Sequence, residues 1–412
     1  MNKPLEVFLG ILTAVGGFVE IGELTFSLDA GVDFGYRLLW VSLFGTIGII
    51  VYGEMAGRVA AVRGQPVFGV IRERVGFGAG LATLLAANLI NLLTCAAEIG
   101  GVAIVWQLLA GWPYRALVAF AFVFIVLTVW LLPFEWIERV FGLGGLMMLV
   151  FLVVALREGP DWGTLAAGLV PGWPNDATGS RLVLYAFYGV ALLSSVMLPY
   201  ETYFYAAGAI EDGWTPKDIT LNRVVVIVGF LLGSLLSVAL IAIGAQFFEP
   251  RGAKPALPGL AALPAAREFG HAGLLLALGG MFFAFAGAAI ETGLSGAYNL
   301  AHFFGWPWGK SRPPRNAARF CASWIAIFAL AALVVGSGID PVDVVEWSIV
   351  LAVVVLPLSY FPLLVVAADR RIMGEHANGG LANALGVFYL VVVTLAALCA
   401  IPLFALTRGG RG

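Results

Sequence analysis

The sequence predicts an all-α integral membrane protein with eleven transmembrane helices, and three observations lead to this prediction. Hydrophobic residues make up 61% of the 412 residues and charged residues only 12%, whereas soluble domains carry about 25% charged residues. Apolar runs recur along the chain, and each is long enough to cross a bilayer. Short loops that contain proline, glycine and charge separate these runs. We therefore expect one polytopic unit over residues 1–412 and no soluble domain.

The predicted spans follow one another with short connections, except for a proline-rich loop at 248–271 that we expect outside the cell. Their approximate limits are 5–34, 37–61, 79–110, 115–133, 140–157, 182–209, 222–247, 272–302, 317–337, 344–367 and 382–406. More than half of the 23 basic residues fall on the side of the N-terminus. By the positive-inside rule, this predicts a multi-pass protein of the cell membrane with a cytoplasmic N-terminus and an external C-terminus.

The first span contains an interruption. Its apolar run from Leu5 to Val19 is followed by Glu-Ile-Gly-Glu at 20–23, and a charged side chain at mid-membrane costs roughly 2.5–3.5 kcal/mol. We interpret this segment as a broken helix in which Gly22 lets the backbone unwind. Glu20 and Glu23 would then line a polar site together with the freed carbonyls. The alternative is a loop before the first true span, because an apolar run of about 15 residues is short.

The sixth span contains a second interruption, where Pro199 is followed by Tyr200 and Glu201. Proline removes a helical hydrogen bond and clashes with the preceding turn. Spans one and six correspond if the chain has two five-helix halves, and an offset of five spans inverts one half relative to the other. We therefore predict an inverted repeat, with repeat A at about 5–157, repeat B at about 182–367 and an extra helix at 382–406. Paired broken helices indicate the central site of a transporter, not of an enzyme.

Other polar residues lie within the predicted spans. Asn88, Asn91, Cys95 and Glu98 share one face of span three. We expect the asparagines to form interhelical hydrogen bonds, and Glu98 either to accept a proton or to be a buried acid bonded to them. Glu291 in span eight is a further candidate for the site, or it pairs with a hydroxyl on a neighbouring helix.

Several polar residues receive purely structural interpretations. The cysteines Cys95, Cys321 and Cys399 lie in apolar segments without the spacing of a disulfide framework or a zinc site. Glu135 and Glu138 are expected to be solvated at a helix end. The three histidines are given no ligand role. A net charge of −2 offers no footprint for nucleic acid, and we expect no cofactor and no obligate protein partner beyond the lipid bilayer.

Five segments carry a resemblance to a known family. They are FGYRLLWV at 34–41, GRVAAVRGQP with IRERVG at 57–76, TCAAEIGG at 94–101, VMLPYETYFYAA at 196–207 and ADRRIMG at 368–374. These segments resemble the NRAMP family of proton-coupled divalent-metal transporters, and the resemblance covers nearly the whole chain. It implies the leucine-transporter-like fold of inverted five-helix repeats.

The resemblance also assigns roles at the two breaks. The family motif Asp-Pro-Gly-Asn in span one corresponds to 20–23, which implies that Glu20 and Glu23 coordinate the metal. The family motif Met-Pro-His in span six corresponds to Leu198-Pro199-Tyr200. The soft thioether and the histidine of the family are therefore replaced by leucine and tyrosine.

Three further positions follow from the same resemblance. The carbonyl of Ser195, one turn before the second break, remains available to a metal. Tyr205 takes the place of a second family histidine, and Cys95 with Glu98 takes the place of an acidic pair. One acid of the family's proton relay is thus lost and one is retained, so Glu98, Tyr205 and Glu291 are the candidates for a proton pathway.

These departures leave a site made of oxygen ligands. Such a site suits Mg²⁺, Mn²⁺ or Ca²⁺ better than softer transition metals. We predict a secondary-active carrier of Mg²⁺ or Mn²⁺ that works by alternating access, with proton coupling as an added hypothesis. Spans 1, 2, 6 and 7 would rock against spans 3, 4, 8 and 9. In the alternative, Glu20, Glu23 and Tyr200 hold a small organic cation or amino acid, with tyrosine faces adding cation–π attraction.

Overall fold

The computed structural model of the chain describes residues 19–174, 179–255, 257–310 and 312–410. Over these residues it is helical and contains no β-strand. Ten helical segments of this described part are long and apolar enough to span a bilayer. The predicted all-α membrane class is therefore confirmed. The count of eleven spans stays a prediction, because the first half of span one lies outside the described residues.

The first half of the chain follows the predicted order of spans. Its elements are α2 (Ile21–Phe34), α3 (Leu39–Arg63), α4 (Val67–Ala110), α5 (Tyr114–Leu131), α6 (Phe134–Gly145), η1 (Leu146–Met148), α7 (Leu149–Arg157) and α8 (Trp162–Gly168). Helix α4 starts earlier than the predicted 79 because a preceding helical segment merges with it. The two parts meet at Gly76, whose φ of 81° is open to glycine but strained for other residues.

The second half contains the remaining spans. Its elements are α9 (Ser180–Val196), α10 (Pro199–Glu211), η2 (Pro216–Asp218), α11 (Ile219–Ile243), η3 (Gly244–Phe248), η4 (Glu249–Arg251), η5 (Pro258–Ala262), α12 (Leu263–Phe304), η6 (Pro314–Asn316), α13 (Ala318–Gly336), α14 (Pro341–Ala368), α15 (Arg370–Met373), η7 (Gly374–His376) and α16 (Gly380–Thr407). The loop predicted at 248–271 is largely helical, since η4, η5 and the start of α12 occupy it.

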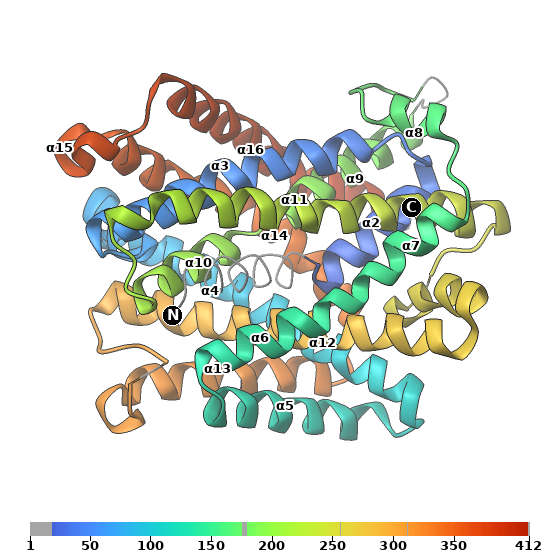
Figure 1. Ribbon diagram of the computed structural model, residues 1–412, viewed down its shortest axis with the longest axis horizontal. Helices are drawn as coiled ribbons and strands as arrows, with labels where there is room; N and C mark the ends of the chain where they lie inside the picture. The colour runs from blue at the N-terminus through green and yellow to red at the C-terminus, as the bar shows by residue number, and fades with distance from the viewer. Residues whose placement is uncertain (1–18, 175–178, 256, 311, 411–412) are drawn as a thin grey trace.

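The helices pack into two groups. In the first group, α3 packs against α11 and α10, and α11 also packs against α2. In the second group, α4 packs against α5, α12 and α13. Figure 1 shows α2, α10 and α14 near the centre, with α3 and α16 at one edge and α5 and α13 at the opposite edge. This division matches the two sets of spans that the sequence analysis expects to move against each other.

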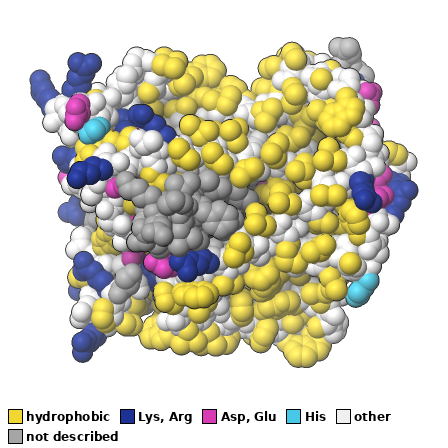
Figure 2. Space-filling model, viewed as in Figure 1, with side chains coloured by type: hydrophobic (Ala, Val, Ile, Leu, Met, Phe, Trp, Pro, Cys, Tyr) yellow, Lys and Arg dark blue, Asp and Glu magenta, His cyan; other side chains and the backbone are white. Residues whose placement is uncertain are grey.

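The surface is that of a membrane protein. Large apolar side chains that are more than two-thirds exposed include Leu131, Leu333, Leu381 and Leu398. In Figure 2, hydrophobic side chains cover the middle of the molecule, while Lys and Arg side chains gather toward two opposite ends. Such an extensive apolar surface would favour aggregation in water, but it is the expected surface of a protein in a bilayer.

Candidate ion-binding site at the two helix breaks

Span six is broken at the predicted position. Helix α9 ends at Val196 and α10 begins at Pro199, while Leu198 between them has the non-helical angles φ −58° and ψ 128°. Proline suits the first position of a helix, because its missing N–H would have no helical partner there. The break therefore follows from one residue, and it leaves the last carbonyls of α9 without helical partners.

Helix α2 begins directly after an extended residue, Glu20, with φ −97° and ψ 174°. The Oε1 atom of Glu20 accepts a hydrogen bond of 2.9 Å from the backbone N–H of Glu23. The backbone N–H of Ile21 donates to Oε1 of Glu98 on α4, also at 2.9 Å. Two carboxyl groups thus satisfy N–H groups of the first turn that have no partner within the helix.

The structure corrects the role predicted for Gly22. This residue lies inside the first turn of α2, so the backbone is not unwound there, and the extended residue is Glu20. A side chain at Gly22 would collide with Oε1 of Glu20 and crowd Ile349 of α14. The glycine is needed for space, because the carboxyl group of Glu20 folds back over the turn to reach its N–H donor.

Glu98 belongs to this site and not to the asparagines of its own helix. It is fully buried, and its carboxyl group lies close enough to that of Glu20 for the two to interact. A hydrogen bond between two carboxyl groups requires a proton on one of them, because an ionised carboxylate only accepts. The pair can therefore store one proton at the start of α2.

The interhelical role predicted for the two asparagines is confirmed. Asn88 Nδ2 donates to the carbonyl of Gly296 at 3.3 Å, and Asn91 Nδ2 donates to Oγ of Ser295 at 3.4 Å. Both bonds join α4 to α12. The alternative in which Glu98 is bonded to these asparagines is not what the structure shows.

Glu23 connects the two breaks. Its Oε1 atom accepts a 2.8 Å hydrogen bond from Oγ of Ser27, and its Oε2 atom accepts a hydrogen bond from Oγ of Ser195, in the last turn of α9. The side chain is fully buried. We predicted the carbonyl of Ser195 as a metal ligand and did not predict a role for its hydroxyl. A hydroxyl beside a helix break is a natural hydrogen-bond donor to a buried carboxylate.

The residues that follow the second break are also buried. Leu198 and Tyr200 are inaccessible to solvent, and Glu201 in the first turn of α10 is 6% exposed. Neither carboxyl oxygen of Glu201 has a hydrogen-bond partner within the described residues. Glu201 and Tyr200 both lie within electrostatic reach of Glu20, so the structure brings them toward the same centre.

Tyr205 has a different environment. Its hydroxyl donates to Oδ1 of Asn222 at 2.8 Å, and Asn222 Nδ2 donates to the carbonyl of Glu54 at 2.9 Å. These bonds tie α10 to α11 and α3. A structural role accounts for Tyr205 fully, and its place in a proton pathway stays a prediction.

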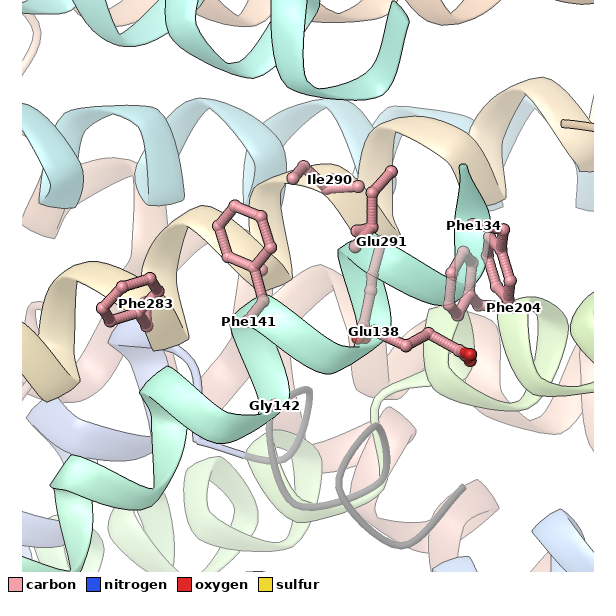
Figure 3. A pocket seen from close by; sticks show the side chains of 10 residues that line it. Phe134, Glu138, Phe141, Gly142, Phe204, Phe283, Ile290 and Glu291 are labelled. Atoms are coloured by element: carbon pink, nitrogen blue, oxygen red, sulfur yellow. The ribbon is translucent and has the colours of Figure 1, made fainter. Parts of the chain in front are cut away.

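Glu138 differs from its predicted state. We expected a solvated residue at a helix end, but Glu138 lines a small internal cavity together with Glu291 (Figure 3). The sequence carried a signal, because Phe134, Ile137 and Phe141 share a helical face with Glu138. Exposed Glu135, one turn earlier, fits the original interpretation.

The described side chains that meet at Glu20 and Glu23 are oxygen donors. They are the carboxylates of Glu20 and Glu23, nearby serine hydroxyls and the carbonyls freed at the end of α9. No group of three or more His, Cys, Asp or Glu side chains in the described part of the chain is arranged to hold a metal ion. A cation here would be held by one or two carboxylates, with carbonyls and water completing its shell.

Comparison with known proteins identifies the family. The profile of the Nramp family, described as natural resistance-associated macrophage protein-like, matches residues 10–402. The divalent metal cation transporter MntH of Ralstonia nicotianae is 27% identical over 94% of this chain and 88% of its own length. The divalent metal cation transporter MntH of Deinococcus radiodurans is 25% identical over 98% of this chain and 90% of its own length.

Solved structures agree on the fold. The Eremococcus coleocola manganese transporter, in complex with an aromatic bis-isothiourea substituted compound, superposes with a TM-score of 0.80 at 18% identity, covering 99% of this chain and 87% of that one. MhsT in complex with L-phenylalanine gives a TM-score of 0.65 at 16% identity, covering 97% and 98%.

The described residues have the leucine-transporter-like fold of multi-pass membrane proteins, and the proteins of the family whose profile matches are transporters, not enzymes. The match over nearly the whole length then gives the family: the chain belongs to the Nramp family. The predicted resemblance is confirmed.

Proposed function

We propose that the protein carries a hard divalent cation, Mg²⁺ or Mn²⁺, across the membrane by alternating access. The observation that carries the proposal is Glu23, whose carboxylate joins Ser27 of α2 to Ser195 of α9, near the start of α2 and the break between α9 and α10. The names of the relatives, divalent metal cation transporter and manganese transporter, support the substrate class.

The ligand chemistry favours a hard ion. Leu198 and Tyr200 stand where the family places a thioether and an imidazole, and the thioether of Met197 in the break packs against Gly48 of α3. Mg²⁺ is held in proteins by one or two carboxylates and retains several waters, and Mn²⁺ also accepts oxygen ligands. Two carboxylates, Glu20 and Glu23, would neutralise the charge of a divalent ion, which lowers the cost of carrying it through a low-dielectric layer.

The serines position Glu23 without saturating it. A carboxylate offers about four lone-pair sites, and the hydroxyls of Ser27 and Ser195 occupy two of them. The remaining lone pairs would be the ones that bind a cation. One oxygen of the carboxylate is bonded to α2 and the other to α9. A change in the relative position of these two helices would therefore move the carboxylate.

The carboxyl pair of Glu20 and Glu98 supplies a route to proton coupling. A cation at Glu20 requires that side chain as a carboxylate. The shared proton would then move onto Glu98, which is hydrogen-bonded to the N–H of Ile21 at its other contact. Binding of a cation at Glu20 would thus move the shared proton onto Glu98.

Orientation and repeat structure belong to the same proposal. We place the basic loops around 58–74 and 310–319 in the cytoplasm, with α8 on the outer side. Figure 1 supports this, since α8 and α15 lie at opposite ends of the molecule. Repeats 5–157 and 182–367 would supply one broken helix each. Reporter fusions at the two termini test the orientation, and a cytoplasmic C-terminus would contradict it.

The substrate is tested by calorimetry on the purified protein with Mg²⁺, Mn²⁺, Fe²⁺ and a set of small amines and amino acids. We expect binding of Mg²⁺ or Mn²⁺ that Glu23→Gln weakens by at least about tenfold, or about 1.4 kcal/mol. Exposed Glu135→Gln is the matched control, because it makes the same change outside the site. Binding of an amine with no response to either metal would refute the proposal in favour of an organic-cation carrier.

A further inference from the structure

A cavity of about 20 Å³ lies between α6, α10 and α12, and this volume is enough for one water molecule. Four phenylalanines, Phe134, Phe141, Phe204 and Phe283, form much of its wall, and among the described residues that line it Glu138 and Glu291 are ionisable. Figure 3 shows both glutamates on the facing helices α6 and α12. An acid such as Glu291 beside a small apolar cavity within the membrane is costly unless it shares a proton or binds water.

The carboxyl groups of the two glutamates are near enough for the charge of one to affect the other. Glu291 is within electrostatic reach of Glu138, and it forms no hydrogen bond to another described residue. From α10, Glu201 and Tyr200 also lie within electrostatic reach of Glu291. A water molecule in the cavity would give the carboxyl group of Glu291 the hydrogen bond that the described residues do not provide.

The cavity lies between the central site and one end of the molecule. On its inner side, buried Glu201 is within reach of both Glu291 and Glu20. On its outer side, Glu138 is half-buried and lies one turn from exposed Glu135 near the start of α6. The turn before α6 is tied to the basic loop after α12, because Lys310 Nζ donates to the carbonyl of Leu132 at 3.0 Å.

We propose that Glu291 and Glu138, bridged by water in this cavity, form a proton path between the central site and the membrane face where α6 begins. The inference rests on the proposed function, since it names a route by which protons pass between the neighbourhood of that site and solvent. The route is separate from Glu98, which faces α2 from α4.

The transfer balances in atoms and charge. The O–H bond of the Glu291 carboxyl group breaks, the cavity water accepts this proton and gives one of its own to the carboxylate of Glu138. Glu291 is left ionised and Glu138 neutral. Glu138 then releases the proton to bulk water, and Glu291 takes up another from the side of Glu201.

The test uses the full-length protein in proteoliposomes, with one dye for internal pH and one for Mn²⁺. Proton flux is measured during Mn²⁺ uptake and, separately, under an imposed membrane potential without metal. We expect Glu291→Gln and Glu138→Gln to lower both proton fluxes by about a hundredfold, the low end of what a positioned proton-transfer group contributes. Mn²⁺ affinity should stay within about twofold of wild type, and Glu135→Gln should change neither flux.

A second variant tests the water bridge without removing an acid. Gly287 lines the cavity, and a Cβ atom there would meet Cβ of Phe141 at 3.6 Å, an ordinary contact. Gly287→Ala should therefore fold normally, fill much of the cavity and lower the proton flux. Unchanged proton flux in Gly287→Ala would overturn the water-bridged step.

The outcomes separate this inference from the proposed function. Wild-type proton flux that Glu291→Gln and Glu138→Gln leave intact, or no wild-type flux at all, overturns the path. A potential-driven proton flux that depends on Glu291, in a protein that takes up no divalent ion, supports the path and refutes the substrate. Monodisperse elution of each variant shows that a loss of flux is not a loss of fold.

Discussion

Ser195→Ala is the sharpest test of the site, because the chain contains a matched control in the adjacent residue. Both Ser194 and Ser195 are fully buried in the last turn of α9. Ser195 donates to the carboxylate of Glu23, whereas Ser194 donates to the neutral carbonyl of Ile349 at 2.6 Å. The two substitutions remove the same hydroxyl group from the same helical turn but from different partners.

The expected magnitudes differ for a physical reason. A hydrogen bond to a charged group contributes about 1.5–3 kcal/mol and a neutral one about 0.5–1.5 kcal/mol. Loss of the Ser195 hydroxyl frees one oxygen of Glu23 from its place between the half-helices. We expect cation affinity to fall by about 10- to 100-fold. Ser194→Ala should lower thermal stability while it leaves cation affinity within about twofold.

Isothermal titration calorimetry with Mg²⁺ and Mn²⁺ on both variants gives the comparison, and circular dichroism melting gives stability. Equal losses of affinity in the two variants would mean that the hydroxyl acts through general packing. No loss in Ser195→Ala would mean that Glu23 does not need its bond to α9 to hold the cation. Either result refutes the reasoning that the carboxylate is positioned from both breaks.

Two further substitutions test the surroundings. Gly22→Ala should push the carboxyl group of Glu20 from its bond at the start of α2, which we expect to cost about 1–3 kcal/mol of stability by overpacking and to weaken cation binding. Gly189→Ala, where a Cβ atom meets nothing within 4 Å, is its control, and similar cation affinities in the two would contradict the role of Gly22. Tyr205→Phe should lower stability by about 0.5–1.5 kcal/mol through its lost bond to Asn222, with cation affinity unchanged in calorimetry; an affinity loss would place Tyr205 in the site after all.

The spans and the second break could be predicted because their causes are local. Apolar length sets a membrane span, and Pro199 by itself ends one helix and starts another. The predicted limits of span six, 182–209, lie within Ser180–Glu211. Such features need no knowledge of what packs against them.

The details of the first break could not be predicted in the same way. The extended residue in 20–23 is set by two hydrogen bonds. One joins the carboxyl group of Glu20 to the N–H of Glu23, and the other joins Ile21 to Glu98 of α4, which is distant in the sequence. A glycine in a charged segment suggests flexibility, but here it provides space. Tertiary contacts determine the local structure of residues 20–23, and composition does not reveal these contacts.

Glu138 shows a second limit. The expected start of span five at 140 placed it outside the helix, and the actual start of α6 at Phe134 places it one turn inside. An error of a single turn in a boundary therefore changed a solvated residue into one that lines an internal cavity. Whether a residue near a predicted helix end is buried is better predicted from the helical face on which it lies than from its distance to the loop.

The carboxyl groups that hold the first turn of α2 are also the ones that would receive the cargo. Glu20 accepts from the N–H of Glu23, and Glu98 from that of Ile21, so loading the carrier must redistribute the partners of these amides. The structural order of this helix end would therefore depend on whether a cation is bound. Hydrogen–deuterium exchange at just these two amides would then follow loading directly, without any label on the ion.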